Sequence, residues 1–249
     1  MLRCHYRSRP LRSMNPHTTL ITGSTHGIGL HLAHEFARNR HELVLVGPVE
    51  GDLDSLADAL SEEHGIHVEY LAKDLTRAEA PEEIFADLQQ RDIQIEILVN
   101  NAGSRAEGMA WQLPIEGEIA SVRLNIEAVL WLTNLCLASM LQRQRGRILN
   151  VTGVAVPEPV LAVHHATDAF IRSWAEALAV ELEDTPITIT TLCAGPVDLD
   201  LFAKAALREN LAFDEPCLRE VAKIAYQGLM NGELFVNASA ENWSSAKAW

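Results

Sequence analysis

Short apolar runs alternate with longer amphipathic segments along most of the chain, beginning with the run Thr18–Thr22 and the helical periodicity of residues 28–38. Such alternation is typical of βαβ units, in which a crossover helix joins two parallel strands. We expect strands at residues 18–22, 42–46, 68–72, 95–99, 147–151, 187–192 and 233–236. We expect helices at residues 28–38, 53–64, 81–90, 119–141, 163–182, 201–211 and 215–230. The sequence therefore predicts an α/β fold: a single Rossmann-like, doubly wound parallel sheet of seven strands with helices on both faces.

Length and charge restrict the classes of partner. The chain has 249 residues, enough for one α/β domain, and its formal net charge is −14. Because an acidic surface is repelled by nucleic-acid phosphates and anionic lipids, we expect neither a nucleic acid nor a membrane as a partner. No uninterrupted apolar run approaches the roughly 20 residues that a membrane-spanning helix needs.

The cysteines and the first residues indicate where the domain lies and in which compartment it works. The four cysteines are scattered and form no C-x-x-C pair, which predicts reduced thiols, a cytoplasmic location and no metal site. The Arg-rich start carries no apolar signal segment, so residues 1–16 are expected to form a disordered extension. Residues 17–249 are expected to form the domain, with a short lid near residues 199–214.

A glycine-rich segment, Thr22-Gly-Ser-Thr-His-Gly-Ile-Gly29, separates the first expected strand from the first expected helix. In this context Gly23 makes a tight turn, Gly27 lets the backbone approach a pyrophosphate, and Gly29 permits close packing of helix on sheet. The amides at the helix N-terminus favour an anion. The segment, with Thr25 and Ile28 in it, predicts a nucleotide-binding loop. The alternative is that the glycines serve backbone geometry alone, with no ligand.

The spacing of these glycines resembles the Thr-Gly-x-x-x-Gly-x-Gly motif of the short-chain dehydrogenase/reductase family. Further segments match that family in order and spacing over residues 18 to 237: Asp74-Leu75, Asn100-Asn-Ala-Gly103, Asn125 and Cys193-Ala-Gly-Pro-Val-Asp198. The resemblance implies a dinucleotide held by ten residues: Gly23, Thr25, Gly27, Ile28, Gly29, Asp74, Leu75, Asn101, Ala102 and Gly103.

The resemblance leaves the cofactor open: NAD, NADP or none. After the second strand the chain reads Gly47-Pro-Val-Glu50, with no Arg or Lys to meet a 2′-phosphate, which favours NAD; Glu50 or Asp52 could reach a ribose hydroxyl from the loop. Near the nicotinamide end of the site, Ala194 replaces the family's Pro and Leu199 stands close to its usual Thr.

The catalytic positions depart from the family, in which Ser, Tyr, Lys and Asn act together. Carried over onto this chain, the Tyr position falls on His164 and the Lys position on Asp168. The Ser position falls on Gly153, or on Thr152 with a shift of one residue. Asn125 is retained, and a shift of one residue to His165 finds no Lys either.

His164 and Asp168 are spaced i, i+4 and so share one face of the expected helix. A carboxylate beside an imidazole favours its charged form and orients its tautomer, which makes the pair a candidate general acid/base. We take His164, Asp168, Asn125 and the adjacent His165 as candidate catalytic residues, and predict no metal site.

Three hypotheses remain for function. The first is a non-redox acid/base enzyme (an isomerase, cyclase, dehydratase or lyase) acting on a small hydroxy or keto compound. The second is an atypical NAD(P)-dependent oxidoreductase with His164 as proton donor. The third is a catalytically silent pseudoenzyme or partner subunit. Residues 119–141 are apolar on more than one face, so we expect a homodimer or homotetramer.

Overall fold

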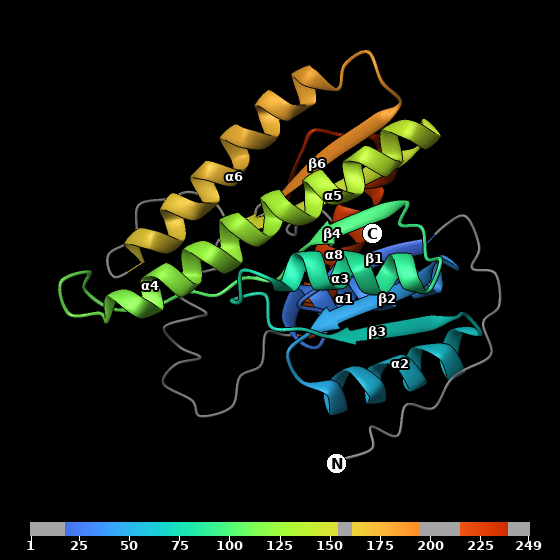
Figure 1. The fold of residues 1–249 in the computed structure, drawn as a ribbon, viewed down its shortest axis with the longest axis horizontal. Helices are drawn as coiled ribbons and strands as arrows, with labels where there is room; N and C mark the ends of the chain where they lie inside the picture. Colours follow the sequence, from blue (N-terminus) through green and yellow to red (C-terminus); the bar gives the residue numbers. More distant parts are fainter. Residues whose placement is uncertain (1–17, 154–160, 195–214, 239–249) are drawn as a thin grey trace, which may run out of the picture.

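One parallel sheet organises the molecule (Figure 1). The computed structural model describes residues 18–153, 161–194 and 215–238. Its seven strands lie in the order β3-β2-β1-β4-β5-β6-β7, and every neighbouring pair is parallel. The strands are β1 (Thr18–Thr22), β2 (Glu42–Gly47), β3 (Val68–Ala72), β4 (Ile97–Asn100), β5 (Gly146–Gly153), β6 (Ile187–Ala194) and β7 (Phe235–Ala238). The predicted doubly wound sheet is confirmed.

Helices cover both faces of this sheet. They are α1 (Gly27–Arg38), α2 (Glu50–His64), α3 (Ala80–Gln90), α4 (Ile115–Val122), the π-helical turn η1 (Arg123–Glu127), α5 (Ala128–Arg143), α6 (Ala162–Glu181) and α8 (Glu215–Asn231). Buried side chains of α1, α2 and α8 form one core cluster, and those of α3, α5 and α6 form the other. In Figure 1, α3, α5 and α6 lie on the near side of the strands.

Strand β2 shows why the sheet is covered on both sides. Leu43 and Leu45 belong to the core cluster on one face, and Val44 and Val46 to the cluster on the other. All four side chains are fully buried. Because successive side chains of a strand point to opposite faces, a continuous apolar run needs a helical layer on each side.

Strand β1 lies between β2 and β4, and this position determines where a ligand can bind. The chain leaves β1 toward β2 and later returns to β4 on the other side of β1. In open α/β sheets such a reversal leaves a crevice at the carboxyl ends of the strands. The glycine-rich segment starts at that end of β1.

Several element boundaries differ from the sequence-based expectation. The helix expected at 119–141 begins at Ile115 and is interrupted by the π-helical turn η1. The helix expected from residue 53 begins at Glu50, and the last strand lies at Phe235–Ala238 because that stretch pairs with residues 191–194 of β6. The expected N-terminal extension and the lid near 199–214, with its helix at 201–211, lie outside the described residues.

The helical run Ile115–Arg143 is the one described helix that is long and apolar enough to cross a membrane by length and composition. Its mean hydropathy of 1.5 comes from apolar residues interspersed with charged ones, so the search for an uninterrupted apolar run did not find it. Leu132, Cys136 and Met140 of α5 are buried in the core of the sheet. About a third of the apolar window is buried in this way, at 33%.

The close packing of α8 on β7 predicts opposite effects for two Gly→Ala substitutions in helices. A Cβ at Gly228 would overlap the Cγ2 atom of Val236, whereas a Cβ at Gly117 in α4 would meet nothing within 4 Å. We expect Gly228→Ala to lower the free energy of unfolding by about 1–3 kcal/mol through overpacking. Gly117→Ala should raise it by about 0.5–1 kcal/mol through helix propensity. Guanidinium unfolding of both variants measures the difference, and equal effects would contradict the packing at Gly228.

Candidate active site

The glycine-rich loop connects β1 to α1 in a tight turn that needs glycine at two positions. Gly23 has φ 65° and Gly27 has φ 56°, in the left-handed region that side chains disfavour. The Gly23 amide donates to the Val46 carbonyl of β2 at 2.8 Å, which fixes the start of the loop on the sheet. At Gly27 a Cβ would meet nothing within 4 Å, so the outer side of the loop is open.

Asn101 holds this loop from the end of β4. Its side-chain amide donates to the carbonyls of Thr22, at 3.0 Å, and Gly23, at 2.9 Å. The Thr22 hydroxyl accepts from the backbone amides of Asn101 and Ala102 at 3.0 and 2.9 Å. A Cβ on Gly29 would collide with the Gly23 carbonyl and the Asn101 amide. The Asn101 side chain therefore fixes the loop, a task that the sequence reading did not separate from ligand binding.

The N-terminus of α1 is suited to an anion. His26, at the N-cap position, makes no side-chain capping hydrogen bond, and the first turn contains no acidic residue. The first amides of a helix have no intrahelical partner and carry the positive end of the helix dipole. The described side chains thus leave these amides uncapped, facing the open side of Gly27.

Asp74 and Leu75 follow β3 at the same edge of the sheet. The Thr76 hydroxyl and amide donate to Asp74 Oδ1 at 2.7 and 2.9 Å, and these hydrogen bonds lower the pKa of the exposed Asp74 carboxyl. Leu75 is buried in the core and anchors the segment. Nearby, Lys73 pairs with Glu83 and Asp87 of α3 at 3.0 and 3.1 Å.

Asn125 lies in the π-helical turn η1, and its side chain is held at both ends. Its Oδ1 accepts from the Ser104 amide at 2.9 Å, and its Nδ2 donates to the Ser104 carbonyl at 2.9 Å and to Thr167 Oγ1 at 3.1 Å. The Thr167 hydroxyl in turn donates to the His164 carbonyl at 2.7 Å. Asn125 thereby ties the segment after β4 to α6. Thr167 is a member of this network that sequence reasoning missed.

His164, Asp168 and Gly153 meet where β5 ends against α6. His164 Nε2 lies 3.5 Å from Asp168 Oδ2, and the Gly153 amide donates to the same carboxylate oxygen at 3.1 Å. A Cβ on Gly153 would lie only 2.7 Å from Asp168 Oδ2, so a side chain at position 153 would require this carboxylate to shift. The neighbouring Thr152 hydroxyl donates to the Leu192 carbonyl at 3.0 Å and is buried. Gly153, rather than Thr152, is thus the residue that faces the pair.

Burial and neighbouring charges act on the Asp168 carboxyl in opposite directions. The side chain is 10% exposed, and desolvation raises its pKa above the ordinary value. His164, the Gly153 amide, His165 and Arg172 act to lower it, and desolvation outweighs them. An ionised Asp168 therefore lowers the free energy of unfolding relative to a neutral side chain at this position.

His165 follows His164 and remains beside it. The two ring centroids are 5.6 Å apart, with planes tilted by 51°. His164 Nδ1 and both ring nitrogens of His165 are buried without a hydrogen-bond partner among the described residues. Buried polar nitrogens usually have partners, so these atoms mark a place where a ligand or water can bind.

Several of the predicted residues form one connected group. The glycine loop contacts Asn101, and Ala102 and Gly103 lead on to Asn125, since a Cβ on Gly103 would lie 3.5 Å from Asn125 Oδ1. Thr167 connects Asn125 to α6, where His164 and Asp168 lie. Ala194 ends β6 beside Gly153, while residues 195–198 of the matched segment and Leu199 lie outside the described residues.

Comparisons with known proteins agree on a redox family. The family described as short chain dehydrogenase matches residues 17–210. The very-long-chain 3-oxoacyl-CoA reductase of Emericella nidulans is 33% identical over 190 residues, covering 73% of this chain and 54% of that protein. Oxidoreductase UcpA of Salmonella typhimurium is 30% identical over 209 residues, covering 83% of this chain and 79% of that protein. The chain spans about half the length of the 3-oxoacyl-CoA reductases that it matches.

Two solved structures with a similar fold are also dehydrogenases. The bulky-bulky ketone specific alcohol dehydrogenase of Comamonas testosteroni has a TM-score of 0.78 and 29% identity, covering 92% of this chain and 90% of that chain. A short-chain dehydrogenase of Sphingobium yanoikuyae, solved in complex with NADPH, has a TM-score of 0.77 and 31% identity, covering 92% and 91%.

These relatives correct one expectation. A non-redox acid/base enzyme was predicted first, because the resemblance placed Gly153, His164 and Asp168 at the family's Ser, Tyr and Lys positions. The similar proteins are reductases and dehydrogenases, so that prediction is wrong, and redox function is the better-supported alternative. The match over residues 17–210 and the parallel sheet lead to one conclusion: the chain belongs to the short-chain dehydrogenase family.

Proposed function

We propose that the chain is an NAD(P)-dependent oxidoreductase that interconverts a small hydroxy compound and the corresponding keto compound, with His164 as the proton donor for reduction. The observation that carries this proposal is the contact between His164 Nε2 and Asp168 Oδ2 at 3.5 Å. In this proposal the ring transfers the proton and the carboxylate orients it, beside the carboxyl end of β5. The redox names of the relatives support the reaction class.

The proposed centre differs from that of the family in three residues. At the positions where the family carries Ser, Tyr and Lys, this chain has Gly153, His164 and Asp168. The contacts make the three replacements interdependent, because a side chain at position 153 would displace the Asp168 carboxylate. In this proposal the histidine takes over the proton transfer, and the carboxylate takes over the orientation and charge balance of the proton donor.

The glycine loop has the features that a dinucleotide requires. The uncapped N-terminus of α1 and the open side of Gly27 suit a pyrophosphate. A bound nicotinamide dinucleotide supplies the hydride. A similar dehydrogenase, at 31% identity, was solved in complex with NADPH, which supports a nicotinamide dinucleotide as the class of cofactor.

His164 would give its proton to the carbonyl oxygen of the keto compound. In the protonated state the imidazolium and the Asp168 carboxylate form a neutral pair, which limits the cost of holding either charge in a largely buried site. Asp168 stays oriented because Gly153 donates to it. Asn125 and Thr167 position the first turn of α6. Asn125 donates to the Thr167 hydroxyl, and this hydroxyl donates to the His164 carbonyl.

For the cofactor we propose a preference for NAD over NADP. Glu50 and Asp52 lie in the first turn of α2, directly after β2, and their negative charges oppose a 2′-phosphate. The nearby Lys73 pairs with two acids of α3. The described residues at this strand end therefore offer acceptors for ribose hydroxyls rather than cations for a phosphate.

We also propose that a second copy of the chain packs on the outer side of α4, α5 and α6. Large apolar side chains are exposed there, including Ile115, Ile119, Trp131 and Phe170 at 60, 45, 41 and 42% exposure. A single domain rarely exposes so many large apolar groups on adjacent helices without a partner.

Dinucleotide binding can be tested without loss of the fold. His26→Asp supplies the missing N-cap of α1 and should raise the free energy of unfolding by about 0.5–1 kcal/mol. The same carboxylate lies where a pyrophosphate is proposed to bind, so the Kd for NADH should rise at least about tenfold through charge repulsion. Calorimetry with NADH and NADPH on both proteins measures this change. Lack of binding of either nucleotide to the unaltered chain at millimolar concentration would contradict the proposal.

The proton donor is tested by kinetics. His164→Gln should lower kcat for ketone reduction by about 10²–10⁴-fold, the usual contribution of general acid catalysis, with the Kd for NADH unchanged. His165→Gln is the matched variant, and we expect a smaller loss because, within the described part of the chain, Asp168 forms its ion pair with His164 and not with His165. Steady-state rates on a panel of ketones measure both. A larger loss in His165→Gln would reassign the donor, and tight cofactor binding without any turnover would favour a catalytically silent subunit.

The buried carboxylate predicts a pH-dependent gain in stability. Because burial raises the folded-state pKa of Asp168, its contribution to stability is present at acid pH and is lost as the pH rises through that folded-state pKa. Asp168→Asn removes this titration, so the variant should be more stable than the unaltered chain at pH 7 while losing reductase activity. The gain should shrink as the pH approaches about 3.9, the ordinary value for Asp. Guanidinium unfolding at pH 5, 6 and 7 measures it; a destabilised variant at pH 7 would show that Asp168 is a structural residue.

A further inference from the structure

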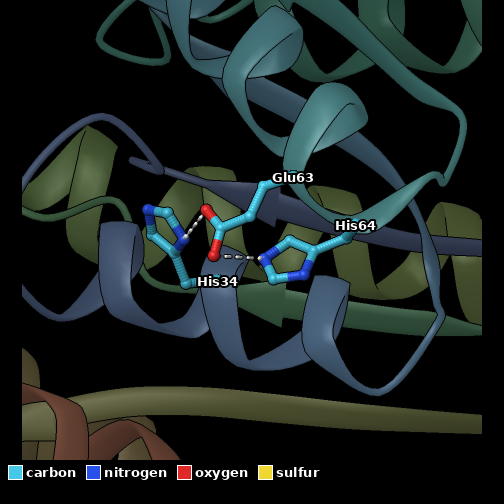
Figure 2. A group of neighbouring side chains, drawn as sticks. All are labelled: His34, Glu63 and His64. Atoms are coloured by element: carbon cyan, nitrogen blue, oxygen red, sulfur yellow. Dashed lines mark ion pairs between the residues drawn. The ribbon is translucent and has the colours of Figure 1, made fainter.

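We propose that His34, Glu63 and His64 form a binding site for a divalent transition-metal ion, with Zn²⁺ the best match. Figure 2 shows the Glu63 carboxylate between the two imidazole rings, one from α1 and one from the last residue of α2. Among the described residues this is the one group of three His, Cys, Asp or Glu side chains that could hold a metal ion. The inference is independent of the proposed redox function.

The three side chains converge on one small volume. His34 Nδ1 lies 4.0 Å from Glu63 Oε2, and His64 Nε2 lies 3.5 Å from Glu63 Oε1. The three possible ligand atoms all lie within 4.8 Å of one another. Ligands of a tetrahedral Zn²⁺, at about 2.0–2.2 Å from the ion, are separated by about 3.4 Å. Small rotations of the side chains bring them to this spacing, and Glu63, 60% exposed, is free to make the largest one.

The chemistry of the donors favours zinc over the hard cations. Two imidazoles and one carboxylate are the protein ligands of several zinc enzymes, in which the fourth position is left to water. Mg²⁺ and Ca²⁺ prefer sets made of oxygen atoms alone. The exposure of Glu63 gives an ion access from solvent, and the net charge of −14 attracts cations to the surface.

The two histidines are held by rigid parts of the fold. Leu32, Ala33 and Phe36 on α1 and Leu60 on α2 are fully buried in one core cluster, so the two helices are fixed relative to each other. The Arg40 guanidinium donates to the His64 carbonyl. Because the two helices are already fixed, a metal ion could bind to these side chains without ordering further backbone.

One of the two imidazoles has a buried ring nitrogen that lacks a hydrogen-bond partner in the described part of the chain. His64 Nε2 is buried without a hydrogen-bond partner among the described residues, and a nearby ion would satisfy it.

The position of the site suggests what an ion would do. His34 lies seven residues after Gly27, about 10 Å along α1 from the glycine loop. A bound ion would therefore lie away from the proposed active site and link α1 to the end of α2. The N-termini of these helices carry the glycine loop and the pair Glu50 and Asp52, so the ion would stabilise the two helices that border the proposed dinucleotide site.

The test is a titration of the full chain with ZnCl₂, after treatment with a chelator and under reducing conditions. Calorimetry should show one equivalent of Zn²⁺ bound, and millimolar MgCl₂ should not compete. His34→Gln, Glu63→Gln and His64→Gln should each raise the Kd by more than the roughly 10–100-fold that loss of an outer-shell partner costs. His67→Gln is the matched control, because His67 pairs with Glu69 at 2.9 Å but has no second imidazole in such a group; its Kd should be unchanged.

A second readout separates this site from the histidines of α6. Zn²⁺ at 100-fold above its Kd should raise Tm by about 5–10 °C in the unaltered chain and in His67→Gln, and by much less in His64→Gln. Co²⁺ should give the intense visible absorption of a tetrahedral site, lost in the same three variants. Absence of zinc binding, or binding that all three variants retain, would overturn the proposal.

Discussion

The two hydrogen bonds from the Asn101 amide to the carbonyls of Thr22 and Gly23 join the ends of β4 and β1, the central strands of the sheet. These hydrogen bonds hold the start of the glycine loop against β4, and the positive φ angles of Gly23 and Gly27 determine the path of its backbone. The same segment continues through Gly103 and Ser104 to Asn125. The position of the π-helical turn, and through Thr167 the first turn of α6, therefore depend on where β4 ends. A change at Asn101 would alter both the glycine loop before α1 and the position of His164 in α6.

The site could be predicted from sequence to the extent that each part is local. The glycine loop, the strands and the i, i+4 pair of His164 and Asp168 follow from spacing along one segment, and the structure brings them to one edge of the sheet. The sequence left open whether Thr152 or Gly153 faces the pair, and the structure decides it. The Thr152 hydroxyl donates to the Leu192 carbonyl, whereas a Cβ added at Gly153 would point to Asp168. The π-helical turn at Asn125 also needed the structure, because the side chain that stabilises the turn bonds to Ser104 and Thr167, 21 and 42 residues away.

The cluster of His34, Glu63 and His64 was missed for a similar reason. The four cysteines form no close pair, and the prediction of no metal site rested on them. His34 and His64 are 30 residues apart, and each alone reads as an ordinary polar residue on the outer side of an amphipathic helix. The packing of α1 beside α2 makes them neighbours, and Leu53, Leu60 and Phe36 set that packing in the core cluster. A periodicity argument that placed both histidines on the sides where the two helices face each other would have found the cluster.

Asp168 connects stability to chemistry in this fold. A largely buried carboxylate with a raised pKa is unfavourable for folding, and an apolar side chain or a neutral amide in its place would remove the cost. The structure instead supports it with the Gly153 amide and the His164 ring, and it leaves position 153 without a side chain to make room. The proposed mechanism gives this unfavourable carboxylate a role, because it would orient the His164 ring and balance the charge of the ring in its protonated state.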